Sequence, residues 1–305
     1  MKRARRIQLV AFFLSALGLS LLVYSGIELP RGVLVVLLAV LVALVGLPHG
    51  ALDPLVARKA GLWRTISGLA GFMGAYLLLA TVAGLLWMWA PKFSLVAFLA
   101  YSAWHFSGDW QDSLSRGWRL CAGATVICAP SLLYPDLVAE YFSVLTGGES
   151  TALVRVLQWL AFPALAGTMF SAARCLRSRP AVAAELAVLA FSAVALPPLI
   201  FFLLYFCSLH SPRHLIDTVR GMNPVTASVT AAGLTLVTVG LGALFFVFSP
   251  STQVDQRLLQ ITFIGLAVLT VPHMILIEYY AARVGNEPAT ATTPPGFENG
   301  SKMTL

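Results

Sequence analysis

Charged residues are scarce in this chain of 305 residues, of which Asp, Glu, Lys and Arg together make up 11%. Hydrophobic residues make up 58%, and the mean hydropathy is +0.83. Soluble domains carry about 25% charged residues, so this composition excludes an ordinary soluble enzyme. The sequence instead contains many apolar stretches of roughly 20 residues, separated by short loops that hold most of the charge. This pattern is typical of a multi-pass membrane protein.

Cysteine pairs are also missing from the sequence. The four cysteines form no CxxC motif and no spacing typical of a secreted disulfide scaffold, so we expect small core residues at Cys121, Cys128, Cys175 and Cys207. The net charge of +7 is compatible with a nucleic-acid partner, but the basic residues lie in small loop clusters rather than on one face. We therefore expect no nucleic-acid binding, and we interpret the clusters as topology signals.

The apolar stretches predict an all-α protein with about ten transmembrane helices in a single domain, residues 1–284. The basic N-terminus and the basic loops place both termini in the cytoplasm of a cell (inner) membrane. Residues 285–305 have few apolar side chains and predict a disordered tail. The predicted spans are residues 7–24, 32 to the mid-50s, 65–89, 93–110, 118–133, 153–173, 181–196, a span that begins at Pro198, 224–248 and 258–280.

The Pro197-Pro198 pair decides between nine and ten spans. Residues 181–209 form one long helix if the pair is tolerated, or two helices if it ends one span and begins the next. The split leaves a short first piece of about 16 residues, or about 24 Å. It also places Arg213 and Arg220 on the cytoplasmic side, where the charge rule expects them. We therefore prefer ten spans.

All five histidines of the chain lie in or near these apolar segments. With ten spans, His49, His105, His210 and His273 lie in one layer, roughly 18 to 26 Å below the outer face. His214 follows His210 by four residues, which stacks both imidazoles on one helix face about 6 Å apart. Ionisable groups at membrane depth are costly and usually functional. Several neutral imidazoles without a neighbouring cysteine suit iron, copper, zinc or nickel, so the sequence predicts a buried metal site.

Two aspartates follow histidines by four residues. Asp53 follows His49 and Asp109 follows His105, so each carboxylate could accept the N–H of that imidazole and fix its tautomer. The alternative for each aspartate is an interfacial carboxylate beside a cluster of basic residues.

Four motifs together resemble one known family. PHGALD at 48–53, WHF at 104–106, LHSPRH at 209–214 and VPHM at 271–274 occur in the order seen in the Brp/Blh family of membrane-bound β-carotene 15,15′-dioxygenases. The resemblance covers nearly the whole chain. One position departs from the pattern, because Ser107 stands directly after WHF, where the family more often has glycine.

This resemblance implies a non-haem Fe(II) enzyme that uses O₂ to cleave the central double bond of β-carotene, a substrate dissolved in the lipid, into two retinal molecules. A retinal-binding rhodopsin is the partner that it suggests. Trp104 and Phe106 are candidates for the wall of a substrate channel. His273 is a candidate for an outer hydrogen-bond donor, a channel residue or a fifth ligand. The iron ligands that the resemblance implies are His49, His105, His210 and His214.

Three other classes of protein stay open at this point. Membrane desaturases and hydroxylases also use histidine-rich sites, but they usually carry eight or more histidines in HxxxH and HxxHH boxes, and this chain has five in all. A haem cytochrome needs axial histidines on opposite faces of the haem, which an i, i+4 pair on one helix cannot provide. A transporter, with intramembrane polar residues along a path, is the non-enzymatic alternative.

Overall fold

A computed structural model describes residues 2–27, 29–249 and 253–285 of the chain. Within these ranges the protein is entirely helical, without a strand, which confirms the predicted all-α class. The predicted tail lies outside the described residues except for Gly285. The helical segments are, in chain order, α1 (Lys2–Tyr24), α2 (Arg31–Leu41), η1 (Val42–Gly46), α3 (Leu47–Gly50), α4 (Asp53–Lys59), α5 (Ile66–Trp89), α6 (Pro91–Ser107), η2 (Gly108–Trp110), α7 (Arg116–Cys128), η3 (Ala129–Ser131), α8 (Pro135–Thr146), α9 (Thr151–Cys175), α10 (Pro180–Ala195), α11 (Pro198–Leu204), η4 (Tyr205–His210), α12 (Ser211–Thr218), α13 (Pro224–Phe248) and α14 (Val254–Gly285). The segments η1 and η4 are π-helical, and η2 and η3 are 3₁₀ turns.

Seven stretches of helix are long and apolar enough to cross a membrane. The count rises to eight if α7 and α8, which are bent by 99° at their junction, form one span. The chain is therefore a multi-pass membrane protein. The other predicted spans coincide with shorter helices, among them α6 and the 16-residue α10. The seven stretches are Arg3–Tyr24, Arg31–Lys59, Ile66–Trp89, Thr151–Cys175, Pro198–Thr218, Pro224–Phe248 and Val254–Ala281.

The predicted break at the proline pair is confirmed. Helix α10 ends at Ala195, Leu196 is extended, and α11 begins at Pro198. A proline has no backbone N–H and sterically excludes the helical conformation from the residue before it, so the two prolines separate the helices. The single long helix over residues 181–209 is therefore wrong.

Two histidines lie in or next to π-helical turns. His49 follows η1, and His210 is the last residue of η4. Pro48 and Pro212 stand close to these turns, and each removes the hydrogen bond that its N–H would make to the carbonyl four residues earlier. The carbonyl opposite Pro212 is that of Ser208, and it accepts a hydrogen bond from Gln8 Nε2 at 2.8 Å instead. This hydrogen bond links helix α1 to the segment that carries His210.

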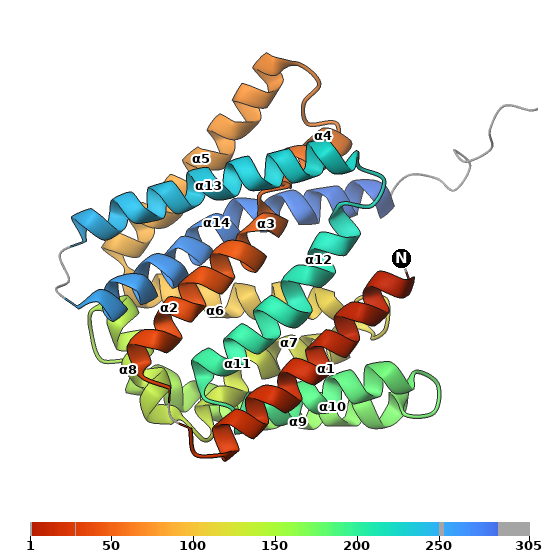
Figure 1. The fold of residues 1–305 in the computed structure, drawn as a ribbon, viewed down its shortest axis with the longest axis vertical. Helices are drawn as coiled ribbons and strands as arrows, with labels where there is room; N and C mark the ends of the chain where they lie inside the picture. Colours follow the sequence, from red (N-terminus) through yellow and green to blue (C-terminus); the bar gives the residue numbers. More distant parts are fainter. Residues whose placement is uncertain (1, 28, 250–252, 286–305) are drawn as a thin grey trace, which may run out of the picture.

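The helices differ strongly in how deeply they lie in the bundle. In an apolar 18-residue stretch within Pro198–Thr218, 56% of the residues are buried inside the protein, whereas the value for the corresponding stretch of α13 is 0%. Helix α11 and the turn η4 therefore form the centre of the bundle, packed against α1, α2, α7 and α10. Figure 1 shows α13 at the edge of the bundle, alongside α14. The four cysteines are free; Cys128 and Cys175 are buried, and the other two are half-buried.

Candidate metal centre

Three histidines from two neighbouring parts of the bundle form the centre of the site. His105 comes from α6, while His210 and His214 come from η4 and α12. Their ring centroids lie 4.7 to 5.2 Å apart. One nitrogen from each ring can be chosen so that all three lie within 4.8 Å of one another. This spacing allows the three imidazoles to bind one ion.

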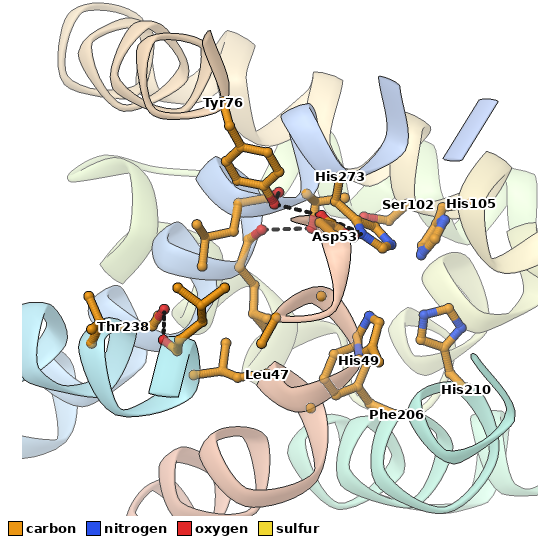
Figure 2. A pocket seen from close by; sticks show the side chains of 18 of the residues that line it. Leu47, His49, Asp53, Tyr76, Ser102, His105, Phe206, His210, Thr238 and His273 are labelled. Carbon is orange, nitrogen blue, oxygen red and sulfur yellow. Dashed lines mark hydrogen bonds and ion pairs between the residues drawn. The ribbon is translucent and has the colours of Figure 1, made fainter. Parts of the chain in front are cut away.

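The two remaining histidines, His49 and His273, lie beside His105 and His210 (Figure 2). The ring of His49 is 5.6 Å from that of His210 and 5.9 Å from that of His214. The ring of His273 is 5.4 Å from that of His49 and 5.5 Å from that of His105. Segments more than 200 residues apart in sequence thus bring five imidazoles into one cluster.

The donor atoms of this cluster fit a metal ion. His210 Nε2, His273 Nε2 and His49 Nδ1 are buried and have no hydrogen-bond partner within the described part of the chain. A buried polar atom without a partner is unfavourable unless something else occupies it. A set of imidazole nitrogens, with no thiolate beside it, is suited to a divalent first-row metal such as iron. The cluster can therefore hold the ion that the sequence motifs predict.

Asp109 forms its hydrogen bond with a different histidine from the one predicted. Its carboxylate lies 3.2 Å from Nδ1 of His210 and accepts a hydrogen bond of 2.6 Å from the hydroxyl of Tyr205. The predicted partner was His105, on the expectation of one continuous helix. Helix α6 instead ends at Ser107, and the tighter 3₁₀ turn η2 carries Asp109 away from the face of His105.

Asp53 also binds a histidine from another helix. Its carboxylate lies 2.8 and 3.0 Å from Nδ1 of His273, and it accepts a hydrogen bond of 2.8 Å from the hydroxyl of Tyr76. The predicted partnership with His49 is wrong because α3 ends at Gly50, and a turn separates it from α4. A spacing of four residues across that turn does not stack the two side chains.

A buried ion pair supports the segment between His210 and His214. The guanidinium of Arg213 lies 2.7 Å from Glu185 on α10 and donates a second hydrogen bond of 2.9 Å to the backbone carbonyl of Asp109. Trp110 Nε1 donates to the same glutamate at 2.7 Å. Glu185 is not among the residues predicted from the sequence. The signal that marks it is a single acidic residue inside the apolar run of α10, where an ionised group needs a partner.

An apolar cavity leads away from the histidines (Figure 2). Phe106 and Phe206 line it, and Phe106 packs against the rings of His210 and Tyr205 at 4.9 Å. Trp104, the other predicted channel residue, lies elsewhere, because its indole donates to Glu278 at 2.9 Å and stacks under Arg116. The cavity wall is formed by parts of η1, α3, α4, α5, α6, α11, η4, α13 and α14.

The far end of the cavity reaches the apolar surface of the bundle between α5 and α13. Leu77 on α5 lines the cavity and is 54% exposed, and Val237 and Leu241 on α13 are 59% and 49% exposed. Side chains that line the cavity and also lie on the surface mark its opening. The exposed side chains at this opening are apolar and belong to helices long enough to cross a membrane, which suits contact with lipid.

Comparison with known proteins adds an independent observation. A family model described as Beta-carotene 15,15'-dioxygenase matches residues 40–280, which include all five histidines. The chain belongs to this family. Within the β-carotene 15,15′-dioxygenase family, the chain is 35% identical over 251 residues to a Beta-carotene 15,15'-dioxygenase of the uncultured marine bacterium 66A03. The aligned part covers 78% of this chain and 91% of the relative.

A second relative in this family is archaeal. The chain is 27% identical over 278 residues to a Probable beta-carotene 15,15'-dioxygenase Blh of Halobacterium salinarum, covering 77% of this chain and 80% of the relative. No solved structure matches the chain. Both comparisons confirm the predicted resemblance to this family. Helix α1, which binds the Ser208 carbonyl through Gln8, lies outside the part that the family model matches.

Proposed function

We propose that this chain is a non-haem Fe(II) dioxygenase that cleaves the central 15,15′ double bond of β-carotene with O₂ to give two molecules of retinal. One observation carries the proposal: a buried cluster of imidazoles lies at the inner end of an apolar cavity that opens toward lipid. Membership of the β-carotene 15,15′-dioxygenase family supports it. The proposed iron ligands are His49, His105, His210 and His214.

The reaction is balanced without a further reductant. The carbon–carbon double bond breaks, and one oxygen atom of O₂ goes to each carbon as an aldehyde. Fe(II) held by neutral imidazoles would supply the reactivity toward O₂ that the side chains lack. The chain itself has to hold the ligand nitrogens, exclude water and position one double bond of a long hydrocarbon.

The residues around the cluster suit these tasks. Asp109 and Asp53 each accept the Nδ1–H of an imidazole, which fixes the ring and leaves Nε2 free to bind a metal. Phe106, Phe202 and Phe206 provide an apolar wall beside the imidazoles. Three of the hydroxyls that line the cavity are occupied, since Thr238 and Thr270 each donate to a backbone carbonyl of their own helix and Tyr76 donates to Asp53. These three side chains therefore present no free hydroxyl hydrogen to a hydrocarbon.

The same proposal includes an orientation in the membrane. We propose ten spans in a cell (inner) membrane with both termini in the cytoplasm, with α6 and α10 as short spans. The breaks that flank α10 and the basic residues that follow α9 and α12 support this arrangement. The carotenoid would reach the cavity from the lipid, and retinal would leave the same way, for instance to a retinal-binding rhodopsin.

The proposal is tested in bacterial cells that make β-carotene. Cells that express the wild-type chain should lose the carotenoid colour and accumulate retinal. Cells that express His210→Ala at the same level should keep their β-carotene. Asp217→Asn, on the exposed end of α12, is the matched control and should bleach like the wild type. Hydroxylated carotenoids instead of retinal, or full bleaching with His210→Ala, would overturn the proposal.

A further inference from the structure

His273 lies in the cluster but is not among the four proposed iron ligands. It is 6% exposed, and its ring is 5.4 Å from that of His49 and 5.5 Å from that of His105. Its Nε2 atom is buried and has no hydrogen-bond partner among the residues that the structure describes. Packing alone does not account for a buried imidazole nitrogen that is left without a partner.

The hydrogen bond to Asp53 fixes where this histidine carries its proton. The Nδ1 atom of His273 lies 2.8 Å from Oδ1 and 3.0 Å from Oδ2 of Asp53. A carboxylate only accepts hydrogen bonds, so Nδ1 is the protonated nitrogen. The neutral ring then has its lone pair on Nε2. This is the arrangement in which protein imidazoles bind metal ions, with a carboxylate behind the ring.

Asp53 is itself held in place by a second donor. The hydroxyl of Tyr76 on α5 donates to Oδ2 at 2.8 Å, and Asp53 is 1% exposed. Residues from α4, α5 and α14 therefore meet around one buried carboxylate (Figure 2). A buried negative charge is costly unless positive charge lies near it. A metal ion on the far side of His273 would provide that charge.

We propose that His273 is a fifth imidazole of the metal centre, positioned by Asp53 and Tyr76. The inference rests on the proposed function, because it assumes that the cluster binds a metal. His273 lines the cavity together with His49, His105 and His210, whereas His214 is not one of the lining residues. His273 therefore contributes the nitrogen on the side from which a substrate in the cavity approaches.

A purely structural role for the same residues has different consequences. The pair of His273 and Asp53 also ties α14 to α4, so a mutation could lower stability without touching the metal. A link between helices predicts a lower unfolding temperature and an unchanged metal spectrum. A fifth imidazole predicts a changed spectrum and weaker metal binding in protein that is still folded.

The experiment uses the full-length protein in detergent, stripped of metal and titrated with Co(II), whose visible absorption reports its ligands. His273→Ala and Asp53→Asn should each weaken Co(II) binding by roughly 10 to 100-fold and shift the absorption bands. Tyr76→Phe should also weaken Co(II) binding and shift the absorption bands, but by less than the other two substitutions. The matched control is Tyr101→Phe, because the Tyr101 hydroxyl lies 3.4 Å from the carbonyl of Val271 on α14, the helix that carries His273. This substitution should leave the Co(II) spectrum unchanged.

Added imidazole should restore the wild-type spectrum of His273→Ala, because the free ligand fits the space left by the side chain. If His273→Ala does not fold, the Co(II) affinity and spectrum of Asp53→Asn and Tyr76→Phe test whether His273 binds the metal. Wild-type affinity and spectrum in folded Asp53→Asn and His273→Ala would overturn the role of His273. If His210→Ala also binds Co(II) as the wild type does, the failure lies with the metal centre itself and not with His273 alone.

Discussion

At the scale of single residues, two aspartates each hold a histidine that belongs to a different helix. Asp109 accepts from His210, and Asp53 accepts from His273. Each aspartate also accepts from a tyrosine, Tyr205 in the first case and Tyr76 in the second. The two units are alike in chemistry although their sequences are unrelated. Such carboxylates orient the ring and raise its basicity as a ligand.

Replacement of Asp109 by asparagine tests the first unit. The amide keeps the shape of the side chain but removes the negative charge, so His210 loses its preference for one tautomer. We expect Asp109→Asn to bind Fe(II) roughly 10 to 100-fold more weakly, measured by titration of metal-free protein. Asp112→Asn, three residues further along and exposed, is the control. Equal affinity in Asp109→Asn and the wild type would contradict the role of the carboxylate.

The sequence predicts the histidines of this cluster but not their hydrogen-bond partners. The apolar surroundings and the spacing of His210 and His214 are visible in the sequence, as is the depth shared by His49, His105 and His273. The aspartates were matched to histidines on the assumption of continuous helices. Helix ends after Gly50 and Ser107 break that assumption, and no residue pattern marks how the next segment turns.

At the scale of elements, the two π-helical turns η1 and η4 pack against each other beside the site. Gly46 in η1 makes this possible, because a Cβ atom built on it would lie 2.5 Å from Cε1 of Phe206 in η4. Phe206 cannot easily move away, since its ring stacks on Phe202 at 5.0 Å and on His210 at 5.6 Å. The close approach therefore sets the position of His210.

Gly46→Ala should separate the two turns. An extra methyl group in a filled core costs about 1 to 3 kcal/mol. We expect a lower unfolding temperature in detergent together with a reduced iron content, because the displacement reaches His210. The control is Gly71→Ala on α5, where an added Cβ meets nothing within 4 Å and the helix gains roughly 0.5 to 1 kcal/mol. A Gly46→Ala protein with wild-type stability and iron would contradict this account.

The helix boundaries follow from prolines more than from hydrophobicity. Pro91, Pro180, Pro198 and Pro224 each stand at the start of a helix, and the pair at 197 and 198, together with the charge rule and the shared depth of the histidines, predicts the break. The π-helical turns were not predicted. Pro48 and Pro212 signal a disturbed helix near each turn, but a proline can also be absorbed without a π turn, as Pro163 is inside α9.

At the scale of the whole molecule, the cavity connects the buried cluster to the exposed apolar surface between α5 and α13. Helix α13 is the least buried of the long helices, so it forms the outer wall of the opening. An opening at this surface would let the proposed lipid-dissolved substrate enter without leaving the membrane.

Narrowing the opening should block the substrate but spare the metal. Val237→Trp places a large ring in the mouth of the cavity, and we expect retinal formation to fall by about 10-fold or more with the iron content unchanged. Val239→Trp, on the same helix but outside the cavity lining, is the control and should turn over like the wild type. Unchanged turnover in Val237→Trp would show that the substrate takes another path.

Reporter fusions test the proposed orientation. Fusions after Arg179 and after Arg220 should both report the cytoplasm, since basic residues collect on that side. A fusion near Pro197 should report the outer side or the membrane, because Pro197 would lie in the outer connection between two separate spans, α10 and α11. An outside signal after Arg220 would contradict the ten-span arrangement.

The most direct measurement is the product yield of purified protein supplied with β-carotene and O₂, before and after loading with Fe(II). The account predicts two molecules of retinal for each β-carotene consumed by the iron-loaded protein, and no product from the metal-free protein. Cleavage by the metal-free protein, or shorter fragments in place of retinal, would contradict it.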